Sequence, residues 1–208
     1  GGTCTPLLTV PVDPAAALLM ADGDGDGRPD LWEIGAAAGE VVVTIHTHAS
    51  GFGERLQPRV TGSTAGAGSV FLAADYDRDG STDLFVVNPG TGELQVWAGP
   101  AFTMPLAAVD LPDGRGEGWR FALGDFDLDG VPDLFALSPD NPARLQILAG
   151  ALGYAGEAEE VPTGVAADEG VIAVGDLDGD GRADLFLLHQ DGSLTVYLGG
   201  QREGASDE

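Results

Sequence analysis

An acidic loop recurs four times along this 208-residue chain, at intervals of 50 to 53 residues. Each copy reads D-x-D-x-D-G-x-x-D, and the copies begin at Asp22, Asp75, Asp125 and Asp176. Aspartates at positions one, three, five and nine place several hard oxygen ligands around one small volume, and the glycine at position six permits a sharp turn. Four carboxylates this close repel one another unless a cation lies among them. The pattern therefore predicts four metal sites.

Calcium is the cation that this ligand set favours. Ca²⁺ accepts six to eight oxygens in a flexible geometry, whereas Mg²⁺ demands a strict octahedron and retains its waters. Position seven varies between copies, so we expect it to contribute its backbone carbonyl, which every residue has. The predicted ligands of four Ca²⁺ ions are Asp22, Asp24, Asp26, Arg28 and Asp30; Asp75, Asp77, Asp79, Ser81 and Asp83; Asp125, Asp127, Asp129, Val131 and Asp133; and Asp176, Asp178, Asp180, Arg182 and Asp184.

An EF-hand shares the first six loop positions, but it also needs a glutamate at position twelve and a helix on each side. Position twelve is occupied by Glu33, Val86, Ala136 and Leu187, so three of the four copies lack that ligand. Each loop is followed by a short apolar run that is typical of a buried strand. The remaining alternative is an acidic turn without a metal. Four copies, which together hold 16 of the 23 aspartates, argue against it.

The segments around each loop predict short strands. An apolar segment precedes every loop, at residues 16–21, 69–74, 120–124 and 171–175. After each loop come Leu and an aromatic residue, then a turn, and in three copies a run that alternates apolar with polar residues. Such alternation indicates a half-exposed strand, and Gly, Pro, Asn and Asp mark the hairpins. Weaker fourth strands follow at residues 105–112 and 158–162. Each unit is thus expected to be a four-stranded antiparallel sheet with the loop between its first two strands.

Four such units of about 51 residues in tandem predict an all-β fold, a single β-propeller domain of four blades. We expect the blades at residues 15–65, 68–115, 118–166 and 170–200. The fourth copy lacks an outer strand, and the N-terminal segment 6–12 has no partner. We therefore expect that segment to complete the fourth blade and close a compact ring. An open array, a fragment of a larger propeller and an eight-bladed ring of two chains are the alternatives.

The loop, the D-L-F that follows it and the strand G-x-L-x-V-Y-L-G at residues 192–199 resemble FG-GAP (VCBS-type) repeats. Such repeats occur in the propeller of integrin α subunits and in many secreted bacterial proteins. The resemblance covers nearly the whole chain and implies that the sixteen loop aspartates are calcium ligands. The phrase that names the family survives only as GFG at residues 51–53 and as looser equivalents near Gly99 and Gly150. Integrin-type rings have seven blades, more than four repeats supply.

Other residues give weaker signals for chemistry. His46 and His48 share one face of a strand and could bind zinc or copper, but no third ligand lies nearby in the sequence. We expect both, and His189, to be surface residues. The sequence contains no Ser-His-Asp order, P-loop or dinucleotide-binding glycine pattern. Nothing selects a glycosidase pair from the candidate glutamates, which are Glu33, Glu40, Glu54 and Glu93.

Aromatic residues recur at equivalent repeat positions. Those that follow the loops are expected to form a core layer; they are Trp32, Phe85, Phe135 and Phe186. Trp97 and Tyr197 share a second position, and Trp119 precedes the third loop. We expect these three side chains to be partly exposed.

The charge of the chain limits its partners. Formal net charge is −25, with nine arginines and no lysine, and four bound Ca²⁺ ions would leave −17. Nucleic acid and anionic membrane surfaces are therefore disfavoured, because phosphate binding needs basic patches. No apolar stretch reaches the ~20 residues that span a bilayer. Cys4 is the only cysteine, which precludes an internal disulfide.

Weak calcium loops bind where calcium is near millimolar, which is outside the cell. No signal peptide is visible, so we expect a mature or excised segment of a secreted or cell-surface protein, extracellular or periplasmic. The leading expectation is a non-catalytic module for adhesion or protein–protein assembly, with calcium as a structural ion. A carbohydrate-binding propeller and a polysaccharide-active enzyme domain are the alternatives, so the ligand is expected to be a protein or a glycan.

Overall fold

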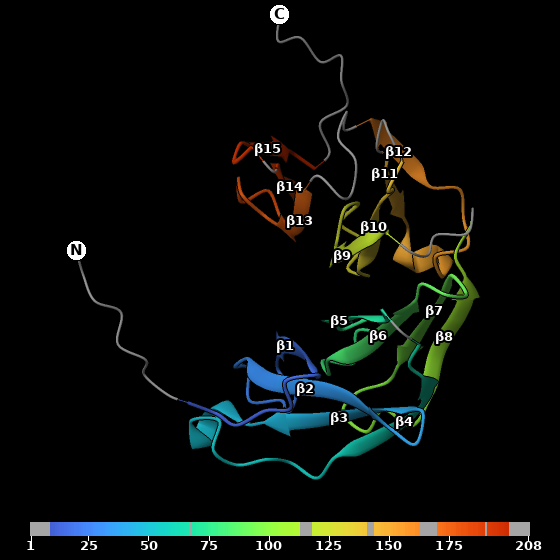
Figure 1. The fold of residues 1–208 in the computed structure, drawn as a ribbon. Helices are drawn as coiled ribbons and strands as arrows, with labels where there is room; N and C mark the ends of the chain where they lie inside the picture. Colours follow the sequence, from blue (N-terminus) through green and yellow to red (C-terminus); the bar gives the residue numbers. More distant parts are fainter. Residues whose placement is uncertain are drawn as a thin grey trace, which may run out of the picture.

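The structure is a computed structural model that describes residues 9–66, 68–112, 118–140, 144–162, 170–189 and 191–199. Four antiparallel sheets are arranged as the blades of a β-propeller, which confirms the predicted fold class (Figure 1). The helical elements within the described ranges are two short 3₁₀ turns, η1 (His48–Ser50) and η3 (Gly150–Leu152). Neither is long and apolar enough to cross a membrane.

Each blade is a meander whose strands pair in chain order. Blade 1 contains β1 (Ala17–Ala21), β2 (Asp30–Ala37), β3 (Glu40–His46) and β4 (Arg59–Thr64). Blade 2 contains β5 (Val70–Ala74), β6 (Asp83–Asn88), β7 (Glu93–Trp97) and β8 (Pro105–Asp110). Blade 3 contains β9 (Arg120–Gly124), β10 (Asp133–Leu137), β11 (Arg144–Leu148) and β12 (Glu159–Pro162). Blade 4 contains β13 (Gly170–Gly175), β14 (Asp184–His189) and β15 (Leu194–Tyr197).

Blade 4 has three strands among the described residues, not the four that we expected. The segment 6–12 was expected to supply the missing strand. Its residues 6–8 lie outside the described ranges, and residues 9–12 form no strand. The described part of this segment is tied to blade 1 instead: the Asp13 N–H donates to Glu33 Oε1 over 2.7 Å, and the Arg55 guanidinium donates to the Pro11 carbonyl.

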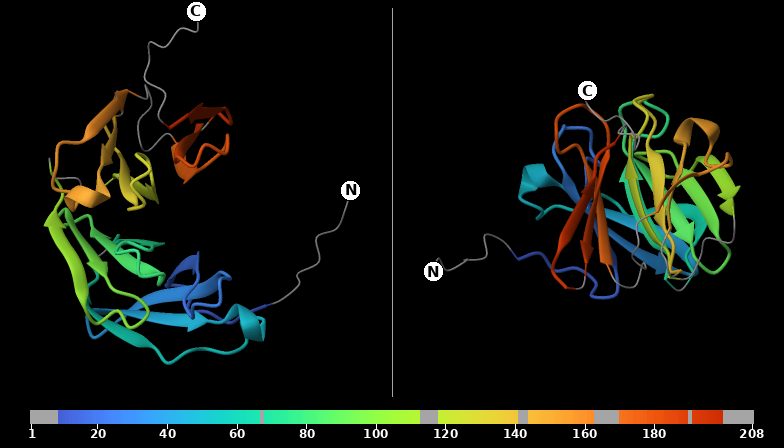
Figure 2. Two further views of the ribbon diagram at one scale, coloured as in Figure 1. Left: turned by 180° about the vertical axis from the view of Figure 1, so that it is seen from behind. Right: turned by 90° about the horizontal axis from the view of Figure 1, so that it is seen from above.

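The first strands of consecutive blades lie next to one another around the propeller axis. β1 contacts β5, β5 contacts β9 and β9 contacts β13, but no comparable contact joins β13 to β1 among the described strands. The blades therefore follow one another along an arc with blade 1 and blade 4 at its ends (Figure 2). The closed ring that we expected is not formed by the described residues.

Apolar side chains from adjacent blades form the core. Trp32, Ile34 and Val43 of blade 1 pack with Leu84 and Val86 of blade 2 in one buried cluster. The same arrangement repeats between blades 2 and 3, and again between blades 3 and 4. Most of the stabilising apolar burial therefore lies between blades.

Five side chains differ from their expected exposure, and one of them is His48, which is half-buried. Phe186 is partly exposed, unlike its buried equivalents Trp32, Phe85 and Phe135, because no further blade covers it. Trp97 is buried: a Cβ on Gly62 of β4 would lie 2.7 Å from its Cη2, so the indole packs under the edge of blade 1. His46 is also buried, since the chain after β3 folds back and Leu56 donates to the Ile45 carbonyl. His189 is half-buried, and its Nε2 lies 2.8 Å from Thr195 Oγ1.

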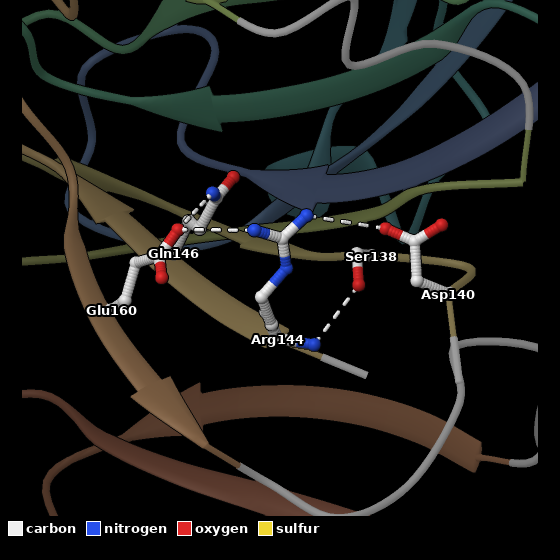
Figure 3. A network of polar contacts seen from close by, with 5 residues as sticks. All are labelled: Ser138, Asp140, Arg144, Gln146 and Glu160. Atoms are coloured by element: carbon white, nitrogen blue, oxygen red, sulfur yellow. Dashed lines mark hydrogen bonds and ion pairs between the residues drawn. The ribbon is translucent and has the colours of Figure 1, made fainter. Parts of the chain in front are cut away.

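The outer strands of blade 3 also share a polar network (Figure 3). Arg144 lies between two carboxylates, with Nη2 3.4 Å from Asp140 Oδ2 and Nη1 3.5 Å from Glu160 Oε1. Its backbone N–H donates to Ser138 Oγ, and Gln146 Nε2 donates to Glu160 Oε1. The two ion pairs are half-exposed, so they contribute little to stability.

Candidate metal centre

Each acidic loop connects the first and second strands of its blade. Long side chains link consecutive loops: Arg78 Nη1 donates to the Asp129 carbonyl over 2.6 Å, and Arg182 Nη1 donates to the Phe126 carbonyl over 3.1 Å. The loops of blades 2, 3 and 4 therefore lie side by side along one rim of the propeller.

Three carboxylates converge in every loop, at positions one, three and nine. In each group one ligand oxygen per residue lies within 4.8 Å of the others, a spacing that could hold a metal ion. The groups are Asp22, Asp24 and Asp30; Asp75, Asp77 and Asp83; Asp125, Asp127 and Asp133; and Asp176, Asp178 and Asp184. No other group of three or more His, Cys, Asp or Glu residues in the described ranges has such a spacing.

The aspartate at position five has a different place in the structure. In each loop one of its oxygens accepts the N–H of position seven, as when Val131 donates to Asp129 Oδ1 over 2.7 Å. The same bond joins Arg28 to Asp26, Ser81 to Asp79, and Arg182 to Asp180. The converging groups therefore contain three of the four predicted carboxylates. Ligation by position five and by the position-seven carbonyl remains a prediction.

The aspartate at position one organises the loop backbone. In the third loop Asp125 Oδ1 accepts the Leu128 N–H over 2.8 Å, and Oδ2 accepts the Gly130 N–H over 3.0 Å. Glycine is required at position six because φ there is between 80° and 89° in all four loops. Position four also has a positive φ, including 62° at Arg78 and 67° at Leu128, which the sequence pattern did not indicate.

The aspartate at position nine is buried and connects the loop to the far end of its own blade. In blade 3, Asp133 Oδ2 accepts the Phe126 N–H over 2.8 Å, and Oδ1 accepts the Gly150 N–H over 2.8 Å. The corresponding donors to Oδ1 in the other blades are His48, Gly99 and Gly199. Each of these residues follows the third strand of its blade, so one carboxylate joins two segments that lie far apart in sequence.

Glycine is needed at this contact in blades 2, 3 and 4 because the backbones approach closely there, whereas the donor in blade 1 is His48. A Cβ on Gly99 would lie 2.1 Å from the Thr82 carbonyl oxygen, and one on Gly150 would lie 2.3 Å from that of Pro132. A buried aromatic follows each glycine: Phe102 and Tyr154 both have a positive φ, of 55° and 62°. Sequence reasoning did not assign these residues to the site. The glycine-rich equivalents near Gly99 and Gly150 were the signal that could have found them.

The electrostatics of the groups favour a cation. Burial raises the pKa of Asp83 and of Asp133 above the ordinary aspartate value, and neighbouring loop carboxylates raise each further, against the lowering effect of the donated N–H groups. A carboxylate oxygen that accepts one N–H still has a lone pair for a metal ion. The donors are hard oxygens, as Ca²⁺ and Mg²⁺ require. The residues thus fit a structural divalent cation.

The histidines lie outside the converging ligand groups found among the described residues. His46 Nε2 lies 2.8 Å from Glu33 Oε2, and both side chains are largely buried. His48 stacks edge-on against Phe52, and its backbone N–H donates to Asp30 Oδ1 over 2.6 Å. Neither imidazole belongs to a group of three converging ligands in the described ranges. Both have structural neighbours instead.

Comparison with known proteins supports the repeat and the fold. Residues 75–136 match the family model of the FG-GAP-like repeat. No curated protein matches the chain. A solved structure of an Agrocybe aegerita lectin, described as recognising non-reducing terminal N-acetylglucosamine, has a TM-score of 0.63 and 22% sequence identity. The match covers 89% of this chain and 50% of the lectin chain, so this chain spans half of that length.

At 22% identity the lectin structure shows a shared fold alone. The matched segment 75–136 includes the second and third acidic loops, and the same loop geometry recurs in all four blades. Residues 75–136 are therefore similar to the FG-GAP-like repeat, and the described residues form a propeller fold.

Proposed function

We propose that the four loops bind Ca²⁺ and that the chain is a non-catalytic binding module whose blades calcium stabilises. One observation carries the proposal: the same group of three carboxylates, one of them buried, occurs at the same place in every blade. Close, desolvated carboxylates destabilise a fold unless a cation compensates their charge. A repeated site of this kind is expected where metal binding and blade folding are coupled.

Calcium binding at these loops would contribute substantially to stability. For a site with a dissociation constant of ~10 μM in ~1 mM calcium, linkage gives about 2.7 kcal/mol. One such site is already large beside the ~5–15 kcal/mol that stabilises a typical domain. Because calcium reaches such concentrations outside the cell, we further propose a secreted or cell-surface location. Adhesion or protein assembly is the function that suits a rigid module there.

Calorimetric titration of the decalcified protein tests the metal proposal. We expect Ca²⁺ to bind with a stoichiometry near four and to raise the melting temperature markedly. Mg²⁺ at equal concentration is the control and should do so much less, because it resists dehydration. If calcium gives no binding heat and a chelator leaves the melting curve unchanged, the four sites are not calcium sites.

A glycan is a second candidate ligand. It is supported by the shared fold of a lectin and by a pocket between blades 1 and 2. This pocket is lined by polar groups that can bond sugar hydroxyls, among them Asp24, Arg59 and Ser81. Arg59 Nη1 is buried and lacks a hydrogen-bond partner, so an acceptor from a ligand would satisfy it.

Binding to a glycan array in calcium buffer tests this second candidate. Replacement of the pocket arginine, Arg59→Ala, should abolish a genuine signal. Arg144→Ala on blade 3 changes an arginine outside the pocket and should leave the signal intact. No signal for the wild-type protein, or an equal signal for both variants, would exclude this pocket as a glycan site.

A further inference from the structure

Blade 4 ends the arc with an apolar sheet face that no other blade covers. Val171, Leu188 and Leu194 are direct neighbours in the strand register, as are Ala173, Phe186 and Val196. Directly paired residues point to the same side of a sheet, so these six side chains form one surface, here called the leading face. Every residue of it is apolar.

The leading face repeats an interface that is buried in the other three blades. By strand register, Phe186, Leu188, Leu194 and Val196 correspond to Phe135, Leu137, Leu145 and Ile147 of blade 3. Those four blade 3 residues are at most 5% exposed, because they pack against blade 4. The corresponding residues of blades 1 and 2 are at most 1% exposed against the blades that follow them.

The equivalent apolar side chains are exposed to solvent in blade 4. Leu188 is 45% exposed, Leu194 is 57% exposed and Val171 is 60% exposed. Contiguous exposed apolar patches are rare on monomers and mark interaction surfaces. The sequence therefore provides blade 4 with an interface for one more blade, and the described part of the chain does not contain that blade.

A complementary surface lies at the other end of the arc. The face of blade 1 that corresponds to the leading face packs against blade 2. There it contacts Phe71, Ala73 and Leu84. The corresponding residues of blade 1, here called the receiving face, are Leu18, Met20 and Leu31. Leu18 is 50% exposed and Met20 is 57% exposed, and both point away from blade 2.

Glu33 and His46 pair with Leu18 and Leu31 in the strand register, so these two polar residues lie within the receiving face. Glu33 occupies the position of Val86 in blade 2, and its oxygens accept the Asp13 N–H and contact His46 Nε2. Because both carboxylate oxygens of Glu33 already have partners, covering this face would not leave the charge unpaired. The apolar part of the receiving face remains available.

We propose that two copies of this chain associate head to tail, with the leading face of each against the receiving face of the other. Contacts between two different surfaces form a closed ring when the rotation closes, and otherwise an open filament. Propellers typically have four to eight blades, so two four-blade arcs complete a ring and three exceed that range. The proposal does not depend on the metal proposal.

The mass of the full chain in solution tests this pairing. Light scattering in calcium buffer at tens of micromolar protein should give twice the chain mass of 21.2 kDa. Leu194→Lys on the leading face and Met20→Lys on the receiving face should each lower the mass to that of the monomer. Met104→Lys is the matched control: Met104 is 58% exposed, lies on neither face and should leave the dimer intact. Circular dichroism checks that every variant folds.

A mixing experiment separates head-to-tail pairing from other dimers. Equal amounts of the two monomeric variants should form a 1:1 dimer, because one intact leading face can still meet one intact receiving face. Three results would overturn the proposal: a monomeric wild-type protein, a dimer that only Leu194→Lys disrupts, or an open-ended series of larger oligomers. The second would indicate contact between two leading faces, and the third would indicate that the ring does not close.

Discussion

At the scale of single residues, the buried aspartate at position nine connects each group of three converging carboxylates to its blade. Asp133 receives an N–H from its own loop and another from Gly150, beyond the third strand. Such charge-assisted bonds are stronger than neutral ones. The hydrogen bond from Gly150 requires a residue without a side chain. A Cβ on Gly150 would lie too close to the Pro132 carbonyl oxygen.

Substitution of this donor should therefore destabilise the protein. Gly150→Ala would place a Cβ 2.3 Å from the Pro132 carbonyl oxygen and force the backbones apart. We expect a loss of about 1–3 kcal/mol in the free energy of unfolding, measured by urea denaturation. Gly35→Ala is the control, because its Cβ meets no atom within 4 Å, and it should change stability by less than ~1 kcal/mol. Equal effects would contradict the close-approach argument.

The hydrogen bonds of Glu33, first with the Asp13 N–H and then with His46, give a pH-dependent contribution to stability. The Asp13 N–H, and then the His46 imidazole, lower the pKa of Glu33 below its ordinary value of 4.5. A lowered carboxyl pKa adds stability above the ordinary pKa, and this stability is lost as pH falls through the lowered value. Glu33→Gln should therefore flatten the decline of unfolding free energy below pH 4.5, whereas the exposed Glu40→Gln should not. Urea titrations at several pH values measure this, and identical slopes for wild type and Glu33→Gln would refute it.

At the scale of elements, the loop between the first two strands is the unit that the sequence repeats. Its backbone is folded by its own carboxylates, as when Asp125 accepts two N–H groups and Asp127 Oδ1 accepts the Asp129 N–H over 3.0 Å. A loop built this way can lose one charge without losing its shape. The half-exposed ion pairs around Arg144 are a weaker element of the fold, because each contributes at most ~1 kcal/mol to the free energy of unfolding.

Calcium binding by one loop can therefore be removed without unfolding its blade. Asp127→Asn keeps an oxygen that accepts the Asp129 N–H but removes one of three negative charges from the group. We expect the calcium stoichiometry in calorimetry to fall from four to three, with the other sites retained. Asp110→Asn on β8 is outside the groups and should keep four. A stoichiometry of four with unchanged affinity for Asp127→Asn would show that the charge of Asp127 does not contribute to calcium binding.

At the scale of the whole molecule, the net charge of −25 opposes compactness through self-repulsion. Bound calcium and dissolved salt should both reduce this electrostatic self-repulsion. We expect the melting temperature of the chelated protein to rise when NaCl increases from about 20 mM to about 500 mM, because screening shortens the Debye length. The calcium-loaded protein should respond less. A larger salt response in the loaded protein would contradict this explanation.

The repeat period and the loop pattern were sufficient to predict the propeller and the three converging aspartates of each loop, because both depend on local spacing. Other features depend on contacts between distant segments and could not be predicted. Trp97 is buried because its indole packs against Gly62 of the preceding blade. Phe186 is partly exposed because no further blade among the described residues covers blade 4. Likewise the close approach at Gly150 joins residues that the sequence separates by a whole hairpin.

The link between the loop and Gly150 has a consequence for how the protein opens. The Gly150 N–H donates to the buried carboxylate of Asp133. This carboxylate also belongs to one of the four groups of converging carboxylates. If the groups hold Ca²⁺ as proposed, release of the ion should loosen this hydrogen bond, together with its counterparts at Gly99 and Gly199. Deuterium uptake at these three glycine amides would therefore report the occupancy of the sites in blades 2, 3 and 4 separately, without a probe that touches the ion.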